Sequence, residues 1–304
     1  MIVEISSLCY NLRSDESGYK GVIMKKRAVI SVNIAVLLFG LAGLFAKWIN
    51  LPALCITFGR VFFSSLSLGL YILIRRQSIR IADKKDFGLL VCAGAILALH
   101  WWSFLESIQL STVAIGTITF SSFPLFVTFL EPLVFHQRLE RRNVIMAIIV
   151  VIGVVITIPE FSMENSMFIG ILIGMLSALA YAVLTIMNKS FAKKYNGTIT
   201  AFYEQAVATI ALLPFIAHIK IQPTPADIGL LLFLGVITTA TAHTLFISSL
   251  KILPAQLAGV CSSMETVYGI LFALFLLGEV PSVREVIGAI IILCVVVFAQ
   301  IDRK

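Results

Sequence analysis

Ten long apolar stretches follow one another along the chain, and only short connections separate them. A bilayer core of about 30 Å needs roughly 20 apolar residues in a helix that rises about 1.5 Å per residue. No connection is long enough to fold as a domain. The sequence therefore predicts an all-α integral membrane protein with ten transmembrane helices, at residues 28–49, 53–74, 87–108, 112–135, 144–158, 167–188, 199–219, 228–250, 255–277 and 286–301.

The composition supports this class and excludes a soluble one. Hydrophobic residues make up 59% of the chain and charged residues 13%, with a mean hydropathy of +1.01, whereas soluble domains have about 45–50% apolar and about 25% charged residues. Such a chain has too few polar residues to cover a water-soluble globule. The five cysteines are scattered and contain no CxxC pair, so they predict neither a disulfide framework nor a metal site.

The basic residues set the orientation, because Lys and Arg near span ends stay on the cytoplasmic side. With both termini cytoplasmic, the outer segments carry only Lys220 and Arg284. All but four of the 23 Lys and Arg residues then lie inside, the other two being Lys47 and Arg60 within spans. This rule also explains the net charge of +7, which gives no reason to expect a nucleic-acid partner.

The first 27 residues precede the first predicted span and form an N-terminal segment. Residues 1–27 contain no apolar run long enough for a secretory signal, and we expect a disordered cytoplasmic segment. Translation from Met24, whose Met-Lys-Lys-Arg is an ordinary cytoplasmic flank, is an alternative.

An internal repeat relates the two halves of the chain. The segment from His100 to Gly116 can be placed over the segment from His243 to Gly259, with His on His and Gly on Gly. The halves, 28–158 and 167–301, each hold five spans, and since five is odd the copies must cross the membrane in opposite directions. Inverted repeats allow a midplane site to open to either side in turn, which is the basis of alternating access.

The layout resembles the drug/metabolite transporter superfamily, in particular its EamA-type members. The resemblance rests on Pro52 with Arg60, His100-Trp101, Thr119 to Glu131 (TFSSFPLFVTFLE), Ser177 to Tyr181, Gly278-Glu279 and Gly288-Ala289. Two positions depart from the family pattern. His136-Gln137 stands where the family favours Gly-Glu, and Glu265-Thr266 stands where a Pro is common.

This resemblance implies two bundles around a central cavity. Spans one to four and six to nine would line the cavity, with spans five and ten at the periphery. The substrates of such proteins range over amino acids, nucleotide sugars, other metabolites and drugs.

Charged residues inside spans are the first candidates for substrate binding, because burial in a bilayer is costly for them. Arg60 lies eight residues after Pro52, roughly 12 Å into its helix, so it needs a partner or a wet cavity; a snorkelling side chain is the alternative. Lys47 could add a second cationic anchor, or it could be an interfacial anchor beside Trp48. Glu106 could pair with either cation.

His100 and His243 occupy matching repeat positions and can change charge near neutral pH; neutral packing residues are the alternative. Glu265 lies mid-span, where it could bind a substrate amine, carry a coupling proton or form a static ion pair. Tyr181 and Tyr268 could wall an apolar part of the substrate. We interpret Glu204 and Glu131 as interfacial, because each lies near a cytoplasmic span end.

The sequence therefore predicts a secondary transporter, and on the resemblance an exporter, of a small metabolite such as an amino acid or organic anion. We expect a monomer or homodimer in a bacterial inner membrane, with no cofactor or metal and with a proton as candidate coupling ion. An uncoupled facilitator or channel is the alternative. An intramembrane enzyme is more remote, because the chain contains neither HExxH nor GxSxG.

Overall fold

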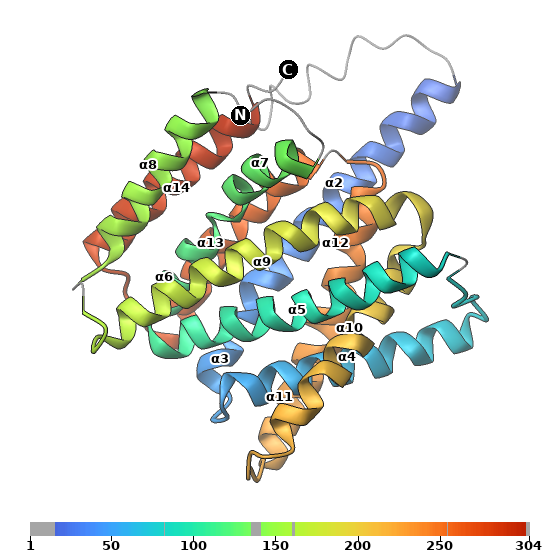
Figure 1. Ribbon diagram of the computed structural model, residues 1–304, viewed down its shortest axis with the longest axis horizontal. Coiled ribbons are helices and arrows are strands. Elements are labelled where there is room, and N and C mark those ends of the chain that lie inside the picture. The colour runs from blue at the N-terminus through green and yellow to red at the C-terminus, as the bar shows by residue number, and fades with distance from the viewer. Residues whose placement is uncertain (1–15, 82, 135–140, 160–161, 254, 302–304) are drawn as a thin grey trace.

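The computed structural model describes residues 16–81, 83–134, 141–159, 162–253 and 255–301. Within these residues all regular secondary structure is helical (Figure 1). The helices are α2 (Glu16–Ala42), α3 (Phe45–Trp48), α4 (Ala53–Ile74), α5 (Lys84–Leu110), α6 (Val113–Phe120), α7 (Phe123–Val134), α8 (Arg141–Thr157), α9 (Ser166–Lys194), α10 (Gly197–Ile216), α11 (Pro225–Phe233), the π-helix η1 (Leu234–Thr241), α12 (Ala242–Leu250), α13 (Ala255–Leu277) and α14 (Val283–Ile301).

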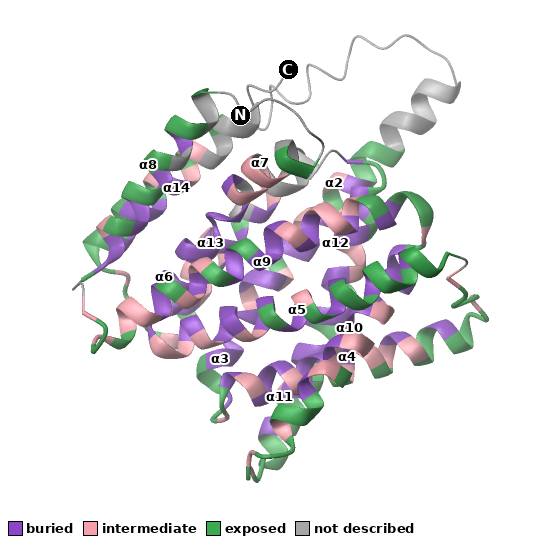
Figure 2. Cartoon of the chain, in the orientation of Figure 1, coloured by how far each residue is buried: buried purple, intermediate pink, exposed green. Residues whose placement is uncertain are grey.

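Six helical segments of the described chain are long and apolar enough to cross a membrane. They are Met24–Trp48, Ala53–Ile74, Lys84–Leu110, Ser166–Lys194, Gly197–Ile216 and Pro225–Leu250. Many large apolar side chains on their outer faces are exposed (Figure 2), among them Ile30, Leu66 and Ile210. An apolar surface of this extent is stable against hydrocarbon and unstable in water.

Two segments differ from the sequence prediction. Helix α2 already begins at Glu16, so residues 16–27 of the predicted disordered tail are helical; the rest of that tail lies outside the described residues. The predicted fourth span breaks at Ser121-Ser122 into α6 and α7. The Ser122 hydroxyl donates to the carbonyl of Thr119 at 2.6 Å, and this local bond favours a bend because it competes with the helical pattern.

The long helices form one bundle with a separate pair at its edge. Helices α5 and α9 run side by side across the bundle, and α4 and α10 pack next to them (Figure 1). Helix α2 packs against α12 and α13. Helices α8 and α14 pack on each other at the edge, where the resemblance placed the fifth and tenth spans.

Two glycines allow the close approaches that position the site. A Cβ at Gly94 in α5 would meet Val207 and the backbone carbonyl of Glu204 in α10. A Cβ at Gly235 in η1 would meet the backbone of α4 at Arg60. Small residues at such crossings let membrane helices pack backbone to backbone, and here they bring Glu204 and Arg60 into the centre.

Candidate functional site

A small cavity lies where α2, α4, α5, α6, α9, α12 and α13 meet. Its free volume is about 20 Å³, which holds about one water molecule. All of the lining side chains are buried, so the cavity is contracted and too small for a metabolite in this conformation. The lining residues are Phe39, Ala42, Arg60, His100, Trp101, Phe104, Phe120, Tyr181, His243 and Glu265.

Arg60 is the buried cation of this cavity, with only 1% of its surface exposed. Its Nε donates to the Thr239 hydroxyl at 3.1 Å, and its guanidinium carbon lies 4.0 Å from the centre of the Trp101 ring. A cation over an indole face is attracted by the ring's quadrupole, most strongly where water is excluded. Arg60 therefore faces the cavity and does not snorkel to the surface.

Glu265 supplies the opposite charge from α13, and it too is buried. The neighbouring Thr266 fixes its helix, because the Thr266 hydroxyl donates to the carbonyl of Thr117 at 2.9 Å and is hydrogen-bonded to the Ser121 hydroxyl. Glu265-Thr266 thus adds a charge to the cavity and ties α13 to α6.

His100 joins α5 to α9. Its Nδ1 lies 2.8 Å from the Ser177 hydroxyl, which itself donates to the His100 carbonyl at 3.1 Å. Because the serine proton is committed to that carbonyl, we assign the proton of this contact to Nδ1. The His100 ring packs on Tyr181 with centroids 4.6 Å apart.

His243 forms a buried pair with Glu204 of α10. Its Nε2 lies 2.7 Å from Glu204 Oε2, and the exposed fractions of the two side chains are 1% and 0%. The interfacial interpretation of Glu204 was therefore wrong, because the close packing at Gly94 turns this face of α10 into the bundle. Glu131, interpreted in the same way, has a side chain that lies outside the described part of the structure.

A sequence signal for Glu204 existed. Thr200, Ala201, Glu204, Gln205 and Ala208 all have 0% exposure and recur at spacings of three and four residues, as one helix face requires. The interfacial interpretation considered only how near Glu204 lies to the span end and did not consider this stripe of small and polar residues.

The remaining predicted site residues lie away from the cavity lining. Lys47 is exposed, and its Nζ donates to the carbonyl of Ser111 at 2.8 Å. Glu106 is half-buried and accepts a hydrogen bond from Trp102. Tyr268 is partly buried and packs against Gly40.

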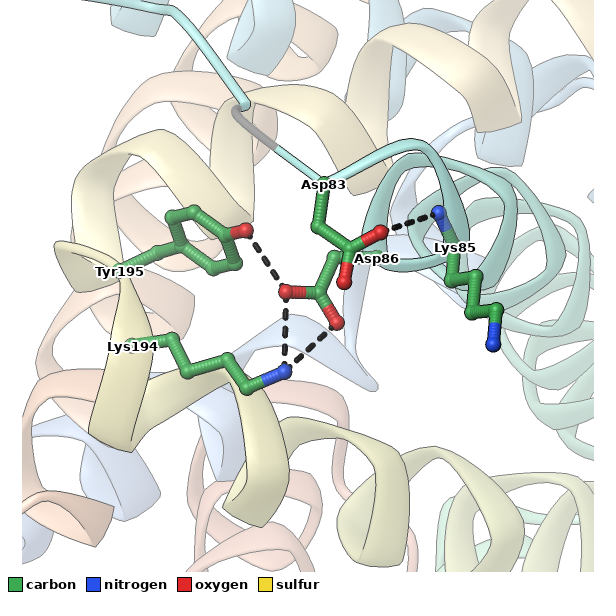
Figure 3. Close-up of polar contacts among 5 residues, drawn as sticks. All are labelled: Asp83, Lys85, Asp86, Lys194 and Tyr195. Carbon is green, nitrogen blue, oxygen red and sulfur yellow. Dashed lines mark hydrogen bonds and ion pairs between the residues drawn. The ribbon is translucent and has the colours of Figure 1, made fainter.

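A polar cluster closes one end of the bundle at the start of α5 (Figure 3). The Asp86 carboxylate accepts from Lys194 Nζ at 2.8 and 3.0 Å and from the Tyr195 hydroxyl at 2.7 Å. This hydrogen bond raises the pKa of the Tyr195 phenol to about 12, so the phenol remains a donor at neutral pH. Asp83 caps α5 by accepting from the Lys85 amide at 2.8 Å.

A second cluster closes the opposite end. The Gln109 amide donates to the carbonyl of Leu51 at 2.8 Å and accepts from the amide of Ala53 at 2.9 Å, which fixes the α3–α4 turn. Thr224 caps α11, and its amide and hydroxyl both donate to the Asp227 carboxylate. Asp227 also accepts from the backbone amide of Asn50 in this turn.

A larger pocket of about 310 Å³ lies beside the Asp86 cluster, between the α9–α10 turn and the end of α12. Lys193, Lys194 and Lys251 line it. The chain described here contains no group of three or more His, Cys, Asp or Glu side chains placed to hold a metal ion.

Comparison with known proteins agrees with this architecture. The profile of the EamA-like transporter family matches residues 26–158 and 168–300. An uncharacterized transporter of Archaeoglobus fulgidus is 26% identical over 88% of this chain and 94% of its own length. An S-adenosylmethionine uptake transporter of Rickettsia bellii is 24% identical over 82% of this chain and 84% of its own length.

The fold also matches a solved structure. One crystal structure has a TM-score of 0.65 at 17% identity and covers 90% of this chain and 96% of that chain. The family and the named relatives are transporters and not enzymes. With both halves of the chain matched by the same family profile, the protein belongs to the EamA-like transporter family and is a multi-pass membrane transporter.

Proposed function

We propose that the protein is a ten-helix secondary carrier that moves a small polar or amphipathic metabolite by alternating access around the Arg60–Glu265 cavity. The observation that carries the proposal is the pair of opposite charges buried with aromatic walls in one contracted cavity. Charged side chains are energetically costly in a membrane interior, so their presence there indicates a functional site.

The lining favours an amino acid or a related organic anion. A carboxylate would bind Arg60, and an amine, where the substrate has one, would bind Glu265. The rings of Trp101, Phe120 and Tyr181 would cover an apolar side chain. S-adenosylmethionine, for which the Rickettsia relatives are named, also carries an amino acid group, although those relatives are named for uptake.

Inverted repeats find further support in the sequence at the two ends of the bundle. Phe45-Ala46-Lys47-Trp48-Ile49-Asn50 matches Phe191-Ala192-Lys193-Lys194-Tyr195-Asn196, and Asp86-Phe87-Gly88-Leu89-Leu90 matches Asp227-Ile228-Gly229-Leu230-Leu231. From Asp227 to His243 the chain has two residues more than from Asp86 to His100. The wider turns of η1 lie in that interval and take up the extra residues, so both histidines still face the cavity.

The matched segments also make matched contacts. Asp86 binds Lys194 and Tyr195 of the second segment, and Asp227 binds Asn50 of the first. We name these the Asp86 clamp and the Asp227 clamp. Both are closed while the cavity is contracted, as expected of an occluded intermediate between two open states.

Orientation follows from the basic residues. With both termini cytoplasmic, the Asp86 clamp and the pocket with Lys193, Lys194 and Lys251 face the cytoplasm, where an exported anion would enter. We place the protein in a bacterial inner membrane. Because one chain supplies every wall of the cavity, a monomer suffices for transport, and a homodimer would hold two independent sites.

The function is tested by finding the substrate first. Purified protein is screened against a metabolite library by thermal shift, and the stabilising compounds are then tested for uptake into proteoliposomes. We expect saturable flux of an amino acid or organic anion that responds to an imposed proton gradient. Flux that neither saturates nor responds to the gradient would instead identify a facilitator or channel, and release of an altered product would identify an enzyme.

A further inference from the structure

We propose that the Glu204–His243 pair is the proton-binding site of this carrier. The inference rests on the proposed carrier function, and it assigns coupling to a carboxylate and an imidazole that lie beside the Arg60–Glu265 cavity. The bound ligand is a single exchangeable proton shared between Glu204 Oε2 and His243 Nε2.

The contact has the geometry of a proton-sharing pair. The two atoms are 2.7 Å apart, and both side chains are inaccessible to solvent. Their helices, α10 and α12, belong to segments that are long and apolar enough to cross a membrane. A carboxylate at such depth is stable only when a positive charge or a proton accompanies it.

The charges of the buried cluster require one proton. Arg60 is the fixed cation of the cluster, and two carboxylates are buried with it, Glu204 and Glu265, which leaves one negative charge in excess. A proton on the Glu204–His243 pair restores neutrality, whether the pair is written as imidazolium and carboxylate or as imidazole and carboxylic acid. Loading and unloading this proton therefore changes the net charge of the cluster by one.

The pair can also communicate with the substrate. His243 lines the cavity, and its ring lies edge-on to the Trp101 ring with centroids 5.5 Å apart, on the indole that Arg60 covers. The titratable groups facing this region from the packed helices are Arg60 of α4, His100 of α5, Tyr181 of α9 and Glu265 of α13.

Unsatisfied polar atoms occur in the pair itself and at the next residue of α10. Glu204 Oε1 and both amide atoms of Gln205 are buried and, within the described structure, have no hydrogen-bond partner. Unpaired polar groups are costly in a hydrocarbon environment. They are the groups that would bind entering water when the bundle opens, and such water would carry the proton to or from the pair.

Trp101 offers a direct test that needs no knowledge of the substrate. In a Trp48→Phe, Trp102→Phe background, Trp101 is the only tryptophan, and a charged imidazole next to the indole would quench its fluorescence. The purified protein in nanodiscs is titrated with acid and base while emission is recorded. We expect one reversible transition, and we expect it to disappear in His243→Gln and in Glu204→Gln, because neither variant can hold an imidazolium beside a carboxylate.

Two controls keep the result interpretable. His218→Gln removes an exposed histidine and should leave the transition unchanged. Size-exclusion profiles and melting temperatures exclude misfolded variants. A transition that persists in both His243→Gln and Glu204→Gln would overturn the assignment.

Transport separates this inference from the carrier function itself. With a substrate in hand, Glu204→Gln should still exchange labelled for unlabelled substrate but should no longer accumulate it in response to a proton gradient. If gradient-driven accumulation survives, the coupling site lies elsewhere while the carrier proposal stands. If the wild-type protein moves no metabolite, the carrier proposal fails independently of the Trp101 titration.

Discussion

The guanidinium carbon of Arg60 lies 4.0 Å from the centre of the Trp101 ring, and each side chain is at least 95% buried. The ring holds the cation on one side, and Thr239 accepts from its Nε. Arg60 is thus positioned before any substrate arrives, which reduces the entropy that binding must otherwise cost.

Replacing the ring should weaken binding. Trp101→Ala removes the cation–π contact that positions Arg60, and because this contact, about 2 kcal/mol when desolvated, is also made without substrate, we expect substrate affinity to fall by less than about 30-fold. Trp101→Phe keeps an aromatic face and should lose less. Trp102→Phe, at a half-buried position bonded to Glu106, is the matched control. Isothermal titration calorimetry in nanodiscs measures the substrate affinity of all three variants. Equal affinities for Trp101→Ala and wild type would refute a role for the Trp101 ring in substrate binding.

Opening of the Asp86 clamp should expose the pocket beside it. Asp86→Asn removes the charge that holds Lys194 and weakens the acceptor for Tyr195. A cysteine placed at Ile247, which lines that pocket and is buried while the clamp is closed, should then react faster with a membrane-impermeant maleimide than the same cysteine does in a protein with Asp86 intact. If loss of the Asp86–Lys194 ion pair causes the faster labelling, the charge-reversed double variant Asp86→Lys, Lys194→Asp should form the pair again and restore slow labelling.

Asp83→Asn is the control for this prediction, because Asp83 caps the same helix without binding Lys194. Labelling that is equally fast in Asp83→Asn and Asp86→Asn would mean that fraying of the helix end, and not the clamp, governs access.

The packing of α5 on α10 should be sensitive at one glycine and tolerant at another. At Gly94 a Cβ would collide with backbone and side-chain atoms of α10, whereas at Gly88 of the same helix it would enter open space. Gly94→Ala should destabilise the protein by about 1–3 kcal/mol, as overpacking does, and lower its melting temperature. Gly88→Ala should not. Equal melting temperatures for the two variants would show that α5 and α10 are less closely packed than the structure describes.

Much of this architecture was predictable because a membrane restricts what an apolar stretch can do. The long helices follow from length and composition, and the cavity residues Arg60, His100, His243 and Glu265 were found because polar groups inside spans are rare. The break at Ser121-Ser122 was not found, since both sides of it are apolar and the hydropathy pattern runs through.

Which side chains contact one another was harder to predict from the sequence than which residues lie inside spans. Lys47 was a candidate cationic anchor with an interfacial role as the alternative, and it is exposed near the α3–α4 turn, where its Nζ donates to the carbonyl of Ser111. Glu204 looked interfacial because depth was measured along its own helix. Burial in a bundle also depends on how closely the neighbour packs, and Gly94 determines that distance.

The most direct test of the central claim is the initial rate of substrate uptake into proteoliposomes for Arg60→Ala and Glu265→Ala. In the proposed carrier Arg60 pairs with a carboxylate of the substrate and Glu265 with its amine. Truncating one partner of a buried charge pair costs about 2–5 kcal/mol, so both rates should fall by at least about 30-fold. Insertion and expression should remain near wild type, and Arg80→Ala and Glu106→Gln, at an exposed and a half-buried position away from the cavity, should transport normally. Wild-type rates in both cavity variants would contradict the account.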